Sequence, residues 1–160
     1  MVIKDRVFLP SVHLCFVINS ANLPVNSLTM SITVTIKDET ATGTVTHEVP
    51  VSFSSELVSV EEIIKARVHA DVEAYNRSLP EYYKGLIQPT EAEKTLNGFK
   101  MKERRKVDPE KQYQVALDAF HKNGYFVLID NIQVESPGQM VVINAATEIS
   151  FIKLTPLVGG

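Results

Sequence analysis

The residues best suited to chemistry in this sequence are the last two, Gly159 and Gly160. Glycine accounts for only 7 of the 160 residues, so composition alone does not explain a pair at the very end. Pro156 lacks an amide donor and is expected to end the preceding strand, which makes residues 155–160 a flexible, extended tail. Because glycine has no side chain, such a tail can enter a narrow slot and bring its carboxylate to a reacting phosphate.

A basic run and an apolar run are candidate docking surfaces for a partner. The stretch 100–106 holds one acidic residue and five basic ones, Lys100, Lys102, Arg104, Arg105 and Lys106. This stretch either steers association with an acidic surface or is a solvated loop. In the apolar run from Tyr125 to Ile129, the outward residues are either Phe126 and Leu128 or Tyr125 and Val127, and the sequence leaves both phases open.

No set of residues predicts a catalytic or metal site. The four histidines have no carboxylate or cysteine at ligand spacing, so they are interpreted as surface or cross-strand residues. The chain lacks the glycine-rich phosphate loop, the Cys-x-x-Cys pair and the Gly-x-Ser-x-Gly turn that mark nucleotide, zinc and hydrolase sites. A solvated helix face accounts for four neighbouring acids, Glu61, Glu62, Asp71 and Glu73. The sequence thus holds no motif for these three kinds of site.

The composition is typical of one globular domain. With 44% apolar residues, 22% charged residues and a net charge of −3, the chain lacks the basic surplus of a non-specific nucleic-acid binder. No stretch reaches the roughly 18 uninterrupted apolar residues that a membrane span needs. The single cysteine, Cys15, indicates a reducing compartment. We therefore expect a cytoplasmic protein without nucleic-acid or membrane partners.

The elements that lead to the tail begin with a predicted hairpin. Alternating apolar residues predict strands over 31–37 and 44–53, and the sequence DETATG over 38–43 predicts the turn between them. Pro50 cannot donate to a sheet ladder, so the second strand is expected to lie at a sheet edge or to end there.

A capping box predicts the first helix. Ser59 and Glu62 have the required spacing, and the helix is expected to continue to about Arg77. One apolar stripe should pack on the sheet and contains Val60, Ile63, Ile64, Val68, Val72 and Tyr75. The following stretch, 81–106, is mixed in character, with a short helix expected over 90–96.

The C-terminal third predicts a second helix and three strands. Asp108 offers an N-cap and Asn123 a left-handed stop for the helix. Its buried residues are expected to be Val115, Leu117, Ala119 and Phe120. Three strands are predicted over 125–129, 139–143 and 147–154. The last is apolar in both phases, which predicts a central strand covered on both faces.

The order of two strands, a helix and three strands that end in Gly-Gly resembles the β-grasp superfamily. This superfamily contains the ubiquitin-like modifiers and the sulfur carriers of thiamine and molybdopterin synthesis. The resemblance rests on the hairpin that starts at Met30 with its helix, on YFVLIDNIQVES over 125–136, and on ISFIKLTPLVGG over 149–160. It implies an α+β fold, a mixed sheet packed on a helix. The chain departs from it by a helical insertion over 79–124, between the first helix and the third strand, and its natural home would be among the larger bacterial ubiquitin-like proteins.

The resemblance implies that this chain is not an enzyme and binds no cofactor of its own, because a partner carries out the chemistry on it. An adenylating enzyme similar to the ubiquitin-activating class would join the Gly160 carboxylate to AMP, and ATP and any zinc would be bound by that enzyme. Its slot would contact Pro156, Leu157 and Val158. A conjugating enzyme, an isopeptidase and protein targets are further expected partners.

Three functions remain open at this stage. The favoured one is a protein modifier, which is joined through Gly160 to an amine of a target protein. It is favoured because the size of the chain and its insertion exceed what a small sulfur carrier needs. The second is a sulfur carrier with a C-terminal thiocarboxylate. The third is a β-grasp interaction module that is never activated.

Residues 1–29 are interpreted as an extra strand or a loose extension. A signal peptide is the alternative, but Pro10 and His13 interrupt its apolar run. A third interpretation is an over-extended start, since Met30 directly precedes the first clear strand. The domain is therefore expected to span 30–160.

Overall fold

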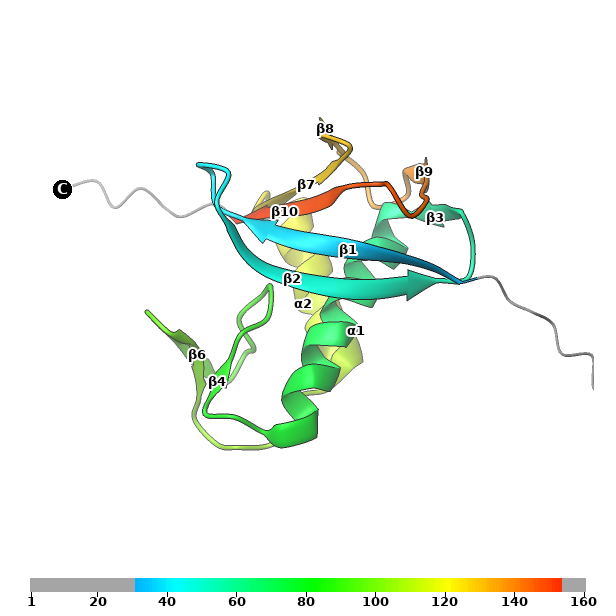
Figure 1. Cartoon of the computed structure of the whole chain (residues 1–160). Helices are drawn as coiled ribbons and strands as arrows, with labels where there is room; N and C mark the ends of the chain where they lie inside the picture. The colour runs from blue at the N-terminus through cyan, green and yellow to red at the C-terminus, as the bar shows by residue number, and fades with distance from the viewer. Residues whose placement is uncertain (1–30, 154–160) are drawn as a thin grey trace, which may run out of the picture.

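The computed structural model describes residues 31–153, which form an α+β fold with two helices and a mixed five-stranded sheet (Figure 1). The sheet has the order β2-β1-β10-β7-β8. Its strands are β1 (Ile32–Glu39), β2 (Val45–Phe53), β7 (Tyr125–Ile129), β8 (Ile132–Gln133) and β10 (Ile149–Lys153). β1 and β10 are parallel, whereas the other neighbouring pairs are antiparallel. The expected N-terminal extension, 1–29, and the tail, 155–160, lie outside the described residues.

β1 and β2 form the predicted hairpin. The period of two places Val34 and Ile36 on the core face, where both are buried. β2, with Pro50, is an edge strand, as the missing amide donor predicts. The prediction that the turn starts at Asp38 is wrong, because β1 continues to Glu39. The Asp38 side chain lies in the core, where it pairs with a buried arginine.

The first helix, α1 (Val60–Ser78), begins at the predicted capping box. The Ser59 hydroxyl accepts a hydrogen bond from the Glu62 amide, and the Ser59 amide donates to the Glu62 carboxylate at 2.7 Å. Leu79, with φ 46°, follows the last turn. All six residues of the predicted stripe are buried. Figure 1 shows α1 against one face of the sheet, so this stripe and the sheet build the core between them.

The capping box gives the stability a dependence on pH. Hydrogen bonds from the Ser59 amide and hydroxyl lower the pKa of Glu62 below its usual range. A carboxyl with a lowered folded-state pKa stabilises the fold above its unfolded-state pKa, and this contribution disappears as pH falls through the folded-state value. We expect Glu62→Gln to lower the free energy of unfolding in urea at about pH 7, and to change it little at about pH 2. The control is Glu73→Gln on the same helix; an equal loss at both pH values for Glu62→Gln contradicts the prediction.

β10 is the central strand of the sheet, as predicted, with β1 on one side and β7 on the other (Figure 1). Ile149 and Phe151 point toward the helices and are fully buried. The expectation that both faces of this strand are largely covered is met more fully on one face than on the other. Ser150 and Ile152 are only half-buried, because they point to the opposite face of the sheet, which neither described helix covers.

The remaining C-terminal strands differ partly from the prediction. Asp130 and Asn131 form a tight turn with φ 50° and 64°, and this turn returns the chain from β7 to the short strand β8. The strand predicted over 139–143 is present as β9 (Met140–Val142). It pairs with β3 (Leu57–Ser59) in a two-stranded sheet of its own and does not join the main sheet.

The insertion starts with a small sheet. Its three strands, in the order β4-β6-β5, are β4 (Tyr82–Tyr83), β5 (Ala92–Thr95) and β6 (Gly98–Met101). The predicted short helix over 90–96 is therefore wrong. Asn97 and Gly98 carry a turn signal, Gly98 has φ 123°, and Thr95 pairs with Gly98 across the hairpin. That signal favours β5 and β6 over a helix.

The insertion ends with the second helix, α2 (Pro109–His121), which packs beside α1. Asp108 caps it and Asn123, with φ 55°, lies just beyond its end, as predicted. Of the four predicted buried residues, Phe120 is buried, whereas Val115, Leu117 and Ala119 are only half-buried. The buried residues are Gln112, Tyr113, Ala116 and Phe120. Gln112 and Tyr113 can be buried because each polar tip has a hydrogen-bond partner, Ile87 and Glu61 respectively.

Candidate functional site

The predicted reactive residues, Gly159 and Gly160, lie outside the described residues, as do Pro156, Leu157 and Val158. The structure does describe the strand that leads to them. Its last described residue is Lys153, at the end of the central strand β10. The residues around Lys153 therefore form the part of the candidate site that has a defined geometry.

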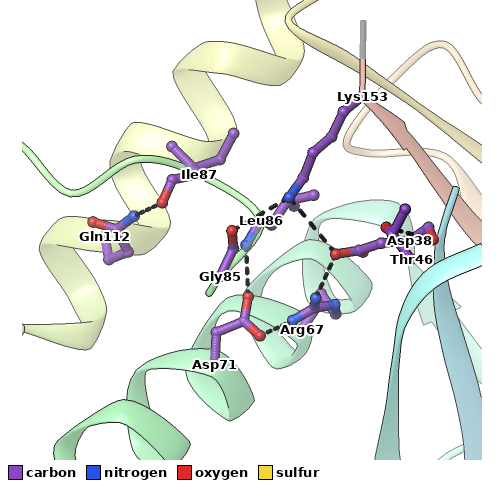
Figure 2. Close-up of polar contacts among 9 residues, drawn as sticks. All are labelled: Asp38, Thr46, Arg67, Asp71, Gly85, Leu86, Ile87, Gln112 and Lys153. Carbon is purple, nitrogen blue, oxygen red and sulfur yellow. Dashed lines mark hydrogen bonds and ion pairs between the residues drawn. The ribbon is translucent and has the colours of Figure 1, made fainter. Parts of the chain in front are cut away.

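A buried ionic network surrounds this end of β10 (Figure 2). Arg67 of α1 is completely buried, and its Nη2 atom donates to Asp38 Oδ2 at 2.9 Å. Its Nη1 atom pairs with Asp71, one turn further along α1. The side chains of both aspartates are at least 96% buried. One guanidinium thus holds two carboxylates out of water, which requires all three groups to stay paired.

Lys153 joins the network to the insertion. Its ammonium donates to the Gly85 carbonyl at 3.3 Å and lies 3.8 Å from Asp38 Oδ2, as Figure 2 shows. Partial burial lowers the pKa of Lys153, and the neighbouring Asp38 and Asp71 offset part of this effect. With Lys153 charged, two cations balance the two carboxylates. The end of β10 is therefore tied to both β1 and the insertion.

The loop 85–87 of the insertion is held from three sides. The Leu86 amide donates to Asp71 Oδ2 at 2.8 Å, and Gln112 of α2 donates to the Ile87 carbonyl at 2.7 Å. With the bond from Lys153 to Gly85, this loop connects α1, α2 and β10 (Figure 2). The insertion is thus part of the structure that fixes where the C-terminal segment starts.

This network corrects one prediction and adds residues that the sequence analysis missed. Asp71 does not belong to a solvated helix face, because Arg67 and the Leu86 amide hold it in the interior. Arg67 and Asp71 lie four residues apart within the apolar stripe of α1. Two charged residues of opposite sign at such positions are the sequence signal from which their buried ion pair could have been predicted. Asp38 and Lys153 gave no such signal, since their partners are more than 25 residues away in the sequence.

Asp71 should control the order of the 85–87 loop. We expect Asp71→Ala to lower the free energy of unfolding by about 2–3 kcal/mol, because the buried Leu86 amide loses its acceptor and Arg67 loses one partner. Hydrogen exchange followed by NMR should show faster exchange at the Leu86 amide in the variant than in the wild-type chain. The increase in rate at Leu86 should exceed the increase at the Val127 amide in the core. Glu73→Ala, at an exposed position of the same helix, is the control. An unchanged ratio of the two exchange rates argues against this role.

A groove of ≈ 670 Å³ adjoins the network. Asp38 and Lys153 lie in its wall, together with His47 of β2. The insertion supplies most of the remaining lining, including Tyr83, Lys84, Leu86, Lys94, Leu96 and Phe99. Its volume falls in the usual range of small-molecule and short-segment sites, roughly 300–1,000 Å³. The last described residue of β10 thus lies beside a cavity of the size of a ligand site.

The basic run 100–106 is divided between paired and unpaired side chains. Lys100 lies 3.3 Å from Glu81, and Arg105 pairs with Glu91. Within residues 31–153, no ion pair involves Lys102, Arg104 or Lys106, and all three are exposed. These three remain available for docking an acidic surface.

The structure shows which side chains of the apolar strand β7 face the core. Tyr125 and Val127 are buried in the core, and Phe126 and Leu128 point to the opposite face of the sheet, where they are half-buried. Phe126 lies beside Ile152 of β10 in the sheet register. The two candidate docking residues therefore belong to an apolar strip on the face that the helices leave open.

In the described part of the chain, no three histidine, cysteine or acidic side chains gather as metal ligands would. Neither α1 nor α2 is long and apolar enough to cross a membrane. Comparison with known protein families, curated proteins and solved structures finds no match for this chain.

Proposed function

We propose that this chain is a ubiquitin-like modifier of the β-grasp class that is activated at the Gly160 carboxylate and joined to amines of target proteins. The observation that carries the proposal is the parallel pairing of β1 with β10. It makes the last described strand the centre of the sheet and directs the chain from there toward Pro-Leu-Val-Gly-Gly.

Support for the fold class comes from the spatial order of the strands. The order β2-β1-β10-β7-β8, with a helix across one face, is similar to the arrangement of β-grasp proteins. In this view β9, β3 and the insertion are additions outside the common sheet. The insertion then contributes the second helix and the small sheet β4-β6-β5.

The proposed chemistry proceeds in three steps on partner enzymes. The Gly160 carboxylate attacks the α-phosphate of ATP, which forms an acyl-adenylate and releases pyrophosphate. A cysteine thiolate of the activating enzyme then displaces AMP and forms a thioester. A target amine attacks the thioester carbonyl, forms an amide and releases the thiol. The adenylate makes the carbonyl carbon reactive, and the absence of side chains at Gly159 and Gly160 lets it reach the nucleotide.

In this proposal the chain itself is a substrate and binds no cofactor. The activating enzyme holds ATP and any zinc, and it grips Pro156, Leu157 and Val158. Phe126 and Leu128 on the open sheet face, and the unpaired residues of the basic run, would contact this enzyme, a conjugating enzyme or an isopeptidase. Since ATP is required, the proposal places the protein in the cytoplasm.

The test is isotopic exchange of pyrophosphate into ATP with the activating enzymes encoded in the same genome. Exchange that depends on this chain supports the proposal, and its absence with every such enzyme overturns it. Mass spectrometry of protein taken from its own cells first checks that Gly160 carries the free carboxylate. Covalent adducts with other proteins then identify a modifier. A mass increase equal to replacement of one oxygen by sulfur identifies a sulfur carrier instead.

A further inference from the structure

The groove beside Lys153 has apolar and basic walls. Tyr83 and Leu86 are buried beneath it, and Phe99 of β6 pairs with Lys94 of β5. Cross-strand partners share one face of a sheet, so an aromatic ring and an ammonium group line the groove together. Leu96, at the tip of this hairpin, is completely exposed at the rim.

The charges of the groove are predominantly positive. Three lysines, Lys84, Lys94 and Lys153, contribute to its lining, whereas the acidic residue in the lining, Asp38, is already paired with Arg67. Within residues 31–153, Lys84 and Lys94 form no ion pair, and both are exposed. The groove can therefore neutralise carboxylates without first breaking an internal pair.

The insertion as a whole differs in charge from the rest of the chain. Residues 79–124 contain nine basic and seven acidic residues, a net charge of +2. Since the whole chain has a net charge of −3, the remaining residues have a net charge of −5. An acidic partner is therefore attracted to the insertion and repelled by the rest of the molecule.

The Asp38 side chain favours a ligand that also carries a hydrogen-bond donor. Its Oδ1 atom is buried at the groove wall and accepts no hydrogen bond from the described residues. Such an acceptor is satisfied when a ligand brings an N–H group to it. A peptide provides both backbone N–H groups and carboxylates, whereas the backbone of DNA provides phosphates without donors.

We infer that this groove binds a short acidic segment of a protein partner, in which an apolar side chain is flanked by carboxylates. The apolar side chain packs on Phe99, whose ring lies beside the buried Tyr83, and the carboxylates pair with Lys84 and Lys94. The chain's own C-terminal segment fits less well, because residues 154–160 contain no aspartate or glutamate.

This inference rests on the proposed function in one respect, the identity of the partner. If Gly160 is activated, the activating enzyme reaches the start of the C-terminal segment at Lys153, which lines the same groove. The acidic segment then belongs to that enzyme. Peptide binding and pyrophosphate exchange are measured separately, so failure of one is distinguishable from failure of the other.

The probe is the blocked hexapeptide Glu-Asp-Leu-Phe-Glu-Asp, titrated into the ¹⁵N-labelled full chain and followed by NMR. We expect amide shifts at Leu86, Lys94 and Phe99, and binding that weakens as salt rises from about 50 to about 300 mM. The double variant Lys84→Glu/Lys94→Glu should weaken binding at least about tenfold, which corresponds to about 1.4 kcal/mol. Lys111→Glu/Lys122→Glu, with the same change in charge on α2 and at its C-cap, should alter it less than about twofold.

Four results overturn the inference. The first is equal binding of the charge-reversed peptide Lys-Lys-Leu-Phe-Lys-Lys, and the second is an equal loss of binding in both double variants. The third is tighter binding of a single-stranded hexanucleotide than of the acidic peptide. The fourth is a chain shortened after Lys153 that binds the peptide about tenfold more tightly, because the chain's own segment then covers the groove. Unchanged amide spectra outside the mutated sites confirm that the variants are folded.

Discussion

Removal of Gly159 and Gly160 is expected to abolish the ATP-dependent exchange of pyrophosphate, by at least about 100-fold. Two residues of extended chain span about 7 Å, so the shortened chain ends that far from the nucleotide. The new C-terminal residue, Val158, also carries a branched side chain, which a slot built for glycine excludes. The measurement is the rate of exchange at saturating ATP, with the wild-type chain as reference.

Two controls separate loss of the carboxylate from loss of structure. A semisynthetic chain that ends in Gly160 carboxamide has the full length and no attacking carboxylate, and it should be equally inactive. Glu73→Ala/Arg77→Ala removes an exposed ion pair of α1 and should leave the exchange unchanged. Exchange by the carboxamide form, or by the shortened chain, would show that Gly160 is not the site of activation.

Replacement of Arg67 should have the largest effect on stability. Arg67→Met keeps an unbranched apolar stem but leaves the Asp38 and Asp71 carboxylates buried without their guanidinium partner. Breaking a buried ionic group in this way typically costs about 3–5 kcal/mol. Urea unfolding at about pH 7 should therefore show a loss of this size, comparable with the total stability of many domains.

The pH dependence identifies the cause of this loss. Burial raises the pKa of the Asp71 carboxyl group in the folded state, and loss of Arg67 removes the charge that opposes this shift. A raised folded-state pKa favours folding below the unfolded-state value, about 3.9 for aspartate, and this advantage is lost as pH rises. The difference between Arg67→Met and the wild-type chain should thus be small near pH 3 and large near pH 7. Arg77→Met, at an exposed ion pair, should cost less than about 1 kcal/mol.

The local elements were predictable because their signals are local. Alternating residues, the Ser59 capping box and the Asp108 cap each act within a few residues of chain, and both helices begin where they were predicted, while β1 extends two residues beyond its predicted end. The error over 90–96 has the same origin. Asn97 and Gly98 are a turn signal just outside the window that was interpreted as a helix.

The described part of the candidate site was not predictable in the same way. Arg67, Asp71, Asp38 and Lys153 come from α1, β1 and β10, and their charges are compatible with solvent exposure when each residue is considered alone. A buried charge is tolerated only where partners meet it, so its burial depends on contacts between distant elements. The charged pair within the apolar stripe of α1 was the available hint.

The sequence by itself determined the α+β class, the starts of both helices, the hairpin, and the Gly-Gly pair on which the proposed function rests. Only the tertiary structure decided which face of β7 is buried, that β10 lies between β1 and β7, and that the insertion supports the end of β10. The physical reason is the distance along the chain over which each kind of interaction acts. Periodicity and caps fix backbone conformation over one element, whereas burial and ion pairing depend on which elements pack together.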